Sequence, residues 1–85
     1  MSYRLELETR AVKELASIPK DRRELLTAVI DDLQKQPRPP GSKKLSGVDG
    51  YRVRKGDYRV LYTIDDAEHR VRVYRIGHRR EVYRR

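Results

Sequence analysis

The sequence predicts an α+β domain in which an antiparallel β-sheet carries an N-terminal helical hairpin on one face and leaves the other face open. Three observations support this fold class. The first residues alternate between apolar and charged side chains, residues 9–36 repeat apolar side chains at helical spacing, and residues 51–76 contain three more runs of strand character. The expected order is therefore β-α-α-β-β-β. Because 85 residues leave little room for a second core, residues 1–85 are expected to form one domain.

The N-terminal half supplies one strand and two helices. In SYRLELE, Tyr3, Leu5 and Leu7 lie on one side of a strand and the charged side chains on the other. Pro19 separates two helical segments, and Pro37 ends the second. The apolar positions that form a stripe on each helix are Ala11, Val12, Leu15 and Ile18, then Leu25, Leu26, Val29, Ile30 and Leu33.

The three later runs supply the rest of the sheet: YRVR (51–54), YRVLYTI (58–64) and RVRVYRI (70–76). A turn at Lys55-Gly56-Asp57 makes the first two a β-hairpin, in which Arg52 is expected opposite Arg59 and Arg54 opposite Asp57. In the third run the alternation breaks after residue 73, so the sequence does not assign its faces.

The charge pattern points to an anionic partner. The chain has 21 Lys and Arg against 13 Asp and Glu, a net charge of +8. Residues 51–85 hold 11 basic and 5 acidic groups, whereas residues 1–50 hold 10 and 8. Such a field indicates a nucleic acid, an anionic membrane or an acidic protein, and arginine suits phosphate best. A solvated basic surface without a partner is the alternative.

Composition also excludes several classes of function. The chain has no cysteine, so neither disulfides nor a Cys-rich zinc site is expected. No apolar run is long enough to cross a membrane, and the first residues do not resemble a signal peptide; a cytoplasmic protein without a membrane partner is expected. His69 and His78 have no carboxylates at ligand spacing, so we expect no metal, and no motif predicts a cofactor.

Strand alternation gathers three arginines on the open face. Arg52, Arg54 and Arg59 are expected there, while their tyrosine and valine neighbours meet the helices. Like charges opposite one another destabilise a sheet unless an anion lies between them, and paired guanidiniums suit a phosphodiester. The alternative is that these side chains extend into solvent, and the residues alone leave both readings open. An open cationic face also fits an acidic partner segment that folds as it binds.

The sequence resembles the RelE/ParE superfamily of toxins from toxin–antitoxin pairs over nearly its whole length. The likeness rests on TRAVKEL, QPRPPGSKKLSG, the hairpin YRVRKGDYRVLYTI and the ending YRIGHRREVY. The RelE branch cleaves messenger RNA in the ribosomal A site and stops translation, without a metal. The resemblance therefore implies a RelE-like fold, mRNA and the ribosome as partners, and a RelB-like antitoxin through which alone the toxin would contact operator DNA.

The same resemblance implies roles for individual residues. Arg52 and Arg59 would hold the phosphate, Arg79 would assist the leaving oxygen, and Tyr83 would stack on a base. The remaining residues expected at the site are Arg54 in the catalytic set, and Lys43, Lys44 and Arg80 as RNA contacts.

One departure from the family concerns the proton acceptor. Well-studied RelE members have lysines at the positions of Arg52 and Arg54, and arginine holds its proton too tightly to act as a base. We expect His78 to take the proton, with Glu81 as the alternative, or positioning and charge to supply most of the rate. A ParE-like inhibitor of DNA gyrase and a non-catalytic basic nucleic-acid-binding module are the competing functions.

Overall fold

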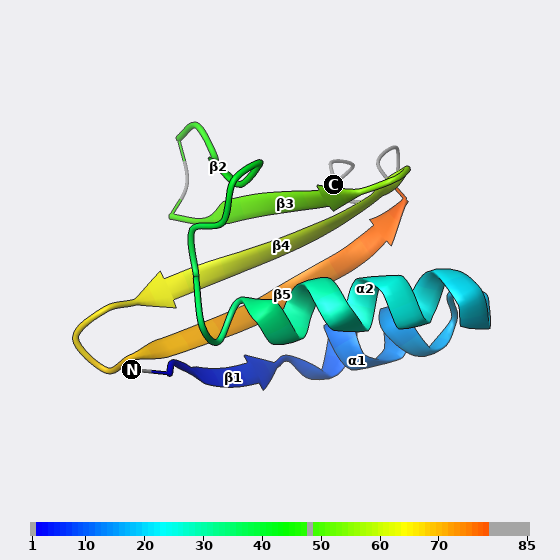
Figure 1. Cartoon of the computed structure of the whole chain (residues 1–85), viewed down its shortest axis with the longest axis horizontal. Coiled ribbons are helices and arrows are strands. Elements are labelled where there is room, and N and C mark those ends of the chain that lie inside the picture. Colours follow the sequence, from blue (N-terminus) through cyan, green and yellow to red (C-terminus); the bar gives the residue numbers. More distant parts are fainter. Residues whose placement is uncertain (1, 48, 79–85) are drawn as a thin grey trace.

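The computed structural model describes residues 2–47 and 49–78, which form two helices and one five-stranded sheet (Figure 1). The elements, in order, are β1 (Arg4–Leu7), α1 (Thr9–Ala16), α2 (Lys20–Asp32), β2 (Lys43–Lys44), β3 (Tyr51–Lys55), β4 (Tyr58–Asp65) and β5 (Arg70–His78). The predicted α+β class is confirmed. Neither of the two described helices is long and apolar enough to cross a membrane.

The strand order in the sheet is β1-β5-β4-β3-β2, and both helices lie on one face of it (Figure 1). Strands β3 to β5 pair antiparallel, as expected, and the short β2, which the predicted order did not include, pairs antiparallel with β3. Strand β1 was expected to be antiparallel but joins parallel to β5. The sheet is therefore mixed, with one parallel edge strand. Alternation of side chains in SYRLELE predicts a half-buried strand but carries no information about its direction, which no tight turn fixes.

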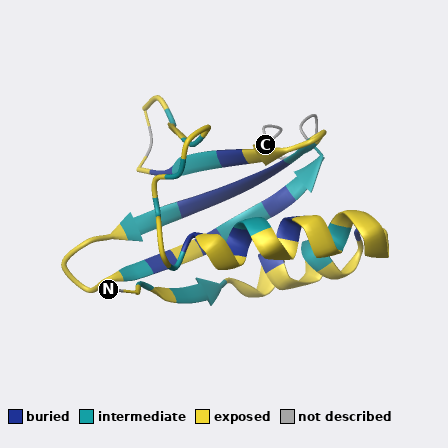
Figure 2. Cartoon of the chain, viewed as in Figure 1, coloured by how far each residue is buried: buried dark blue, intermediate teal, exposed yellow. Residues whose placement is uncertain are grey.

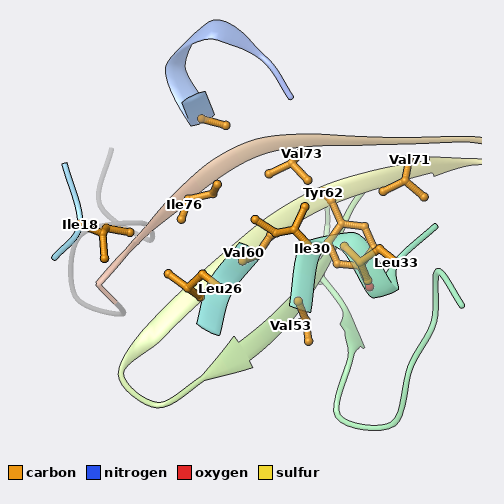
Figure 3. Packing of buried hydrophobic residues seen from close by; sticks show 11 residues of the cluster. Ile18, Leu26, Ile30, Leu33, Val53, Val60, Tyr62, Val71, Val73 and Ile76 are labelled. Atoms are coloured by element: carbon orange, nitrogen blue, oxygen red, sulfur yellow. The ribbon is translucent and has the colours of Figure 1, made fainter. Parts of the chain in front are cut away.

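The core lies between the helices and the sheet (Figure 3). Helix α2 contributes Leu26, Ile30 and its flanking Leu33, and these side chains face residues of β3, β4 and β5. The buried core residues of the strands are Val53, Val60, Tyr62, Val71, Val73 and Ile76. Figure 2 shows buried positions along β4 and β5 and exposed ones on the outer side of α2. Val12 and Leu25 are half exposed, so the helical stripes are narrower than predicted.

The β3–β4 hairpin has a tighter turn than the sequence analysis expected. Gly56 and Asp57 alone form the turn, and Gly56 has a φ of 60°, which suits a two-residue hairpin loop. As a result Arg54 lies opposite Arg59, and Arg52 lies opposite Leu61. The predicted Arg52–Arg59 and Arg54–Asp57 pairings are therefore wrong. Their error is a shift of two residues, and such a shift leaves every side chain on its predicted face.

A β-bulge in β5 explains why its faces could not be assigned. Leu61 pairs with Arg75, but the next residue of β4, Tyr62, pairs with Val73, so Tyr74 is the extra residue. One inserted residue reverses the faces of all residues that follow it. Ile76 therefore points into the core together with Val71 and Val73.

Helix α1 closes the edge of β5 beyond the end of β1. The last β1 pair is Leu7 with Val73, which leaves the following backbone groups of β5 without a strand neighbour on that side. The Glu14 carboxylate accepts a hydrogen bond from the backbone N–H of Ile76 at 2.9 Å and from the Arg75 side chain at 3.1 Å. This carboxylate thus takes the place of a strand partner.

The connector after α2 is fixed by a clasp that we define as Tyr3, Arg38, Tyr51 and Asp66. Arg38 donates two hydrogen bonds to the Asp66 carboxylate, at 2.9 and 3.3 Å, and one to the Tyr51 hydroxyl at 3.2 Å. Tyr3 donates to the same carboxylate at 2.6 Å. Arg38 holds the pKa of Asp66 below its ordinary value, with help from Tyr3, and this carboxylate raises the pKa of Tyr3.

Candidate nucleic-acid interface

The sheet face that points away from the helices carries four cations at adjacent register positions. Arg54 of β3 lies directly opposite Arg59 of β4, and two residues earlier in β3, Arg52 lies directly opposite Lys43 of β2. Directly opposite residues share a face, and so do residues two apart in one strand. We call this set, Lys43, Arg52, Arg54 and Arg59, the cationic cluster.

Among the residues that the structure describes, the three arginines of the cationic cluster have no ion-pair partner, whereas the three arginines of β5 each have one. Arg70 and Arg72 lie toward the other end of the same face, and both contact Glu6, at 3.9 and 3.3 Å. Arg75 pairs with Glu14 at 3.1 Å. Within the described residues, carboxylates of β1 and α1 therefore supply partial counter-charge to the arginines of β5, whereas none forms an ion pair with the cationic cluster.

Burial prevents Arg59 from simply extending into solvent. Its exposed fraction is 7%, and in the part of the chain that the structure describes its Nε atom has no hydrogen-bond partner; the buried Nη1 atom of Arg52 and the Nε atom of Arg70 also have none there. Beside them on this face, Leu61 is only 5% exposed. A buried donor without a partner costs free energy, and a like charge opposite it adds to that cost. This observation favours an anion site over the solvated alternative.

Two cross-strand guanidiniums can bind one tetrahedral anion from both sides. Each guanidinium presents several N–H donors in a planar fork that matches the oxygens of a phosphate. The register makes Arg54 the direct partner of Arg59, with Arg52 diagonal to it. The arrangement can therefore fix a phosphodiester and stabilise added negative charge on its oxygens.

The structure does not bring His78 together with the cationic cluster. His78 pairs with Tyr58, their rings meet edge to face at 6.0 Å, and His78 lines a hollow with Ser17 and Ile18 at the junction of the helices. The physical reason is the bulge at Tyr74, which turns His78 toward the helix side. The register therefore gives no support to His78 as the proton acceptor, and that role stays a prediction.

The remaining predicted site residues fall into two groups. Lys43 belongs to the cationic cluster, whereas Lys44 pairs with Tyr51 and points to the opposite side of the sheet. Arg79, Arg80, Glu81 and Tyr83 lie outside the described residues. The described part of the chain contains no group of three or more His, Asp or Glu side chains that could hold a metal ion.

Sequence reasoning missed the direct Arg54–Arg59 pair, the burial of Arg59 and the buried Leu61 beside it. The expected and the observed hairpin registers place every side chain on the same face, so side-chain alternation cannot distinguish them. The Gly56-Asp57 dipeptide, which is typical of tight hairpins, was the signal that could have favoured the observed register.

The comparisons with known proteins identify the family. Residues 5–83 match the family described as ParE toxin of type II toxin-antitoxin system, parDE. The chain belongs to the RelE/ParE superfamily of toxins. The toxin is 34% identical to Toxin RelG of Mycobacterium tuberculosis over the full length of both chains.

Solved structures of RelE proteins share the fold of this toxin. The archaeal RelE–RelB complex from Pyrococcus horikoshii OT3 superposes with a TM-score of 0.83 and 31% identity, over 95% of this chain and 99% of that one. The isolated E. coli RelE toxin superposes with a TM-score of 0.80 and 31% identity, over 96% of this chain and 92% of that one. The expected membership of the RelE branch is thus confirmed.

Proposed function

We propose that this toxin is a metal-independent endoribonuclease that cleaves messenger RNA in the ribosomal A site and thereby stops translation in the cytoplasm. The observation that carries the proposal is the cationic cluster, in which Arg59 is buried and its Nε atom has no hydrogen-bond partner among the described residues. Similarity to RelE toxins supports the RNA as the anion. A phosphodiester in this position would supply the counter-charge that the described residues do not.

The proposed reaction uses the RNA as its own nucleophile. The 2′-hydroxyl attacks the adjacent phosphorus, the bond to the 5′-oxygen breaks, and the products are a 2′,3′-cyclic phosphate and a 5′-hydroxyl that has taken up a proton. The observed register, in which Arg54 lies directly opposite Arg59, supports these two as the pair that would hold the phosphate and stabilise the charge of the pentavalent transition state, in place of the expected pair Arg52 and Arg59. Arg79 would assist the leaving oxygen, and Tyr83 would stack on a base.

The proton of the 2′-hydroxyl needs an acceptor that the described part of this face does not supply. The positions that neighbour the three arginines there hold Lys43, Leu61, Arg75 and Gly77, none of which accepts a proton near neutral pH. Glu81 is the remaining candidate among the tail residues. Otherwise positioning and charge stabilisation carry the rate.

We infer that the partner of the toxin is a RelB-like antitoxin. The P. horikoshii and E. coli relatives were solved as complexes of RelE with RelB, which supports this partner. An acidic segment would neutralise the cationic cluster and compete with RNA for it. Contact with operator DNA would then occur only through the toxin–antitoxin complex.

Pulsed expression followed by mapping of mRNA 5′ ends tests the proposed activity. The expected result is an arrest of translation with new 5′ ends inside codons. Arg59→Ala should abolish these ends, and Arg72→Ala, which removes a paired arginine from the same face, should retain them. DNA damage without such ends would instead indicate a ParE-like gyrase inhibitor, and neither effect would indicate a binding module without catalysis.

A further inference from the structure

The cationic cluster contains two cation pairs, but a single scissile phosphate requires only one. Arg54 and Arg59 form the first pair, and Lys43 and Arg52 form the second. The two pairs are displaced by two residues along β3, about 6.6 Å, and by one strand spacing of about 4.8 Å across the sheet, so that their centres lie about 8 Å apart. That separation is comparable to the distance between successive phosphates of an extended RNA strand, the form that basic grooves for single strands follow.

We propose that Lys43 and Arg52 form a second phosphate subsite, which binds the phosphodiester next to the one that is cleaved, so that the RNA backbone runs along β3. The subsite rests on the proposed function, because that function places the reacting phosphate at Arg54 and Arg59. It adds the path that the bound RNA backbone follows over β3, and a binding role for Lys43.

The state of Arg52 supports the subsite. Its Nη1 atom is buried and has no hydrogen-bond partner, although the residue as a whole is partly exposed. Lys43 is exposed, so its ammonium can follow a flexible ligand. Neither side chain has an ion-pair partner among the described residues, which leaves both charges available to a phosphate.

The proposal separates two adjacent lysines of equal charge and similar exposure. Strand alternation places Lys43 with the cationic cluster and Lys44 on the opposite side, beside Tyr51. A contact through general electrostatic attraction would involve both lysines equally. A phosphate subsite involves Lys43 alone.

The test uses single-turnover cleavage on ribosomes programmed with an mRNA that carries one uncharged methylphosphonate, placed on either side of the cleaved linkage. With natural mRNA, Lys43→Ala should raise the half-saturating toxin concentration about tenfold and leave the maximal rate within about threefold, because one charged contact is lost. Lys44→Ala and Lys35→Ala should behave like the wild type. With the wild type, one of the two methylphosphonates should raise the half-saturating toxin concentration by the same tenfold factor. With that substrate, Lys43→Ala should raise the half-saturating concentration no further.

A binding measurement keeps the subsite testable apart from catalysis. Fluorescence anisotropy with a 2′-O-methyl RNA oligonucleotide should give a salt dependence whose log–log slope is smaller by about 0.7 for Lys43→Ala and unchanged for Lys44→Ala. If the wild type binds this RNA but cuts no mRNA, the proposed function fails and the subsite remains. The subsite would be overturned if Lys43→Ala and Lys44→Ala gave the same slope. It would also be overturned if the methylphosphonate raised the half-saturating concentration of Lys43→Ala as much as it raises that of the wild type.

Discussion

At the scale of single residues, Arg59 combines two properties that rarely occur together. It is 7% exposed, as a core residue would be, yet its Nε atom has no hydrogen-bond partner among the residues described, and Arg54 lies directly opposite it. A side chain of this kind lowers the stability of the free protein and is favourable only when an anion is bound. Stability and activity should therefore respond to Arg59 in opposite directions.

Replacement of Arg59 by an apolar side chain of similar length tests this opposition. Arg59→Met should raise the free energy of unfolding by about 1–3 kcal/mol, because a buried, unpartnered donor is removed. Urea unfolding of the purified protein measures the change. Arg72→Met removes an arginine that contacts Glu6 at 3.3 Å and should not stabilise the protein. A loss of stability in Arg59→Met would show that Arg59 is satisfied in the free toxin.

His78 offers a second prediction at this scale. Because its ring packs against Tyr58 on the helix side, His78→Ala should keep the single-turnover cleavage rate within about threefold of the wild type. Arg59→Ala, which removes a group that stabilises transition-state charge, should lower that rate by about 10²–10³. A rate loss in His78→Ala as large as that in Arg59→Ala would show that His78 takes part in the cleavage reaction.

At the scale of elements, the clasp of Tyr3, Arg38, Tyr51 and Asp66 connects parts that the sheet pairing leaves apart. Arg38 lies in the connector after α2, Tyr3 precedes β1, and Asp66 lies in the turn between β4 and β5. The hydroxyl of Tyr62 also donates to the Pro37 carbonyl oxygen at 2.7 Å. The connector is thus held against the same end of the sheet by several polar contacts.

The clasp should make stability depend on pH. Since the folded pKa of Asp66 is depressed, its carboxylate stabilises the fold above the unfolded pKa of about 3.9, and this contribution disappears as pH falls through the folded pKa. Asp66→Asn should lower the Tm by a few degrees at pH 7, since the clasp is solvent exposed. Below the folded pKa the two proteins should melt alike. Thermal melts between pH 2 and pH 7 measure this, and a constant Tm difference across the range would contradict it.

At the scale of the whole molecule, the two faces of one sheet have different tasks. One face buries the core against α1 and α2, and the other gathers cations that the described acidic residues balance only in part. The chain carries a net charge of +8, so self-repulsion accompanies its affinity for anions. The proposed antitoxin would relieve that repulsion.

Screening of this repulsion should be visible in the isolated toxin. Its Tm should rise with NaCl concentration, because the Debye length falls from about 10 Å at 0.1 M to 3 Å at 1 M. Arg54→Glu, which places opposite charges across β3 and β4, should raise stability at low salt by about 0.2–1 kcal/mol and flatten the salt dependence. Identical salt curves for the two proteins would show that the Arg54–Arg59 pair contributes nothing to the repulsion.

The hairpin and β5 show how far sequence reasoning reached. The faces of β3 and β4 were predicted correctly, because the tyrosines and valines of YRVR (51–54) and YRV (58–60) alternate with arginines. The register between β3 and β4 was predicted wrongly, since a shift of two residues preserves the alternation of side chains. The bulge at Tyr74 was not predicted either, and it alone decides that His78 leaves the open face.

The sequence by itself therefore determined the fold class and the face on which Arg52, Arg54 and Arg59 lie, because side-chain periodicity is a local property. The family followed from the resemblance of its motifs to those of RelE/ParE toxins. Only the tertiary structure decided that Arg54 lies opposite Arg59, that Lys43 lies opposite Arg52, and that Arg59 is buried with an Nε atom that no described residue satisfies. Register and burial depend on contacts between strands. Those contacts are set by turn geometry, by the bulge and by packing between residues that are distant in the chain.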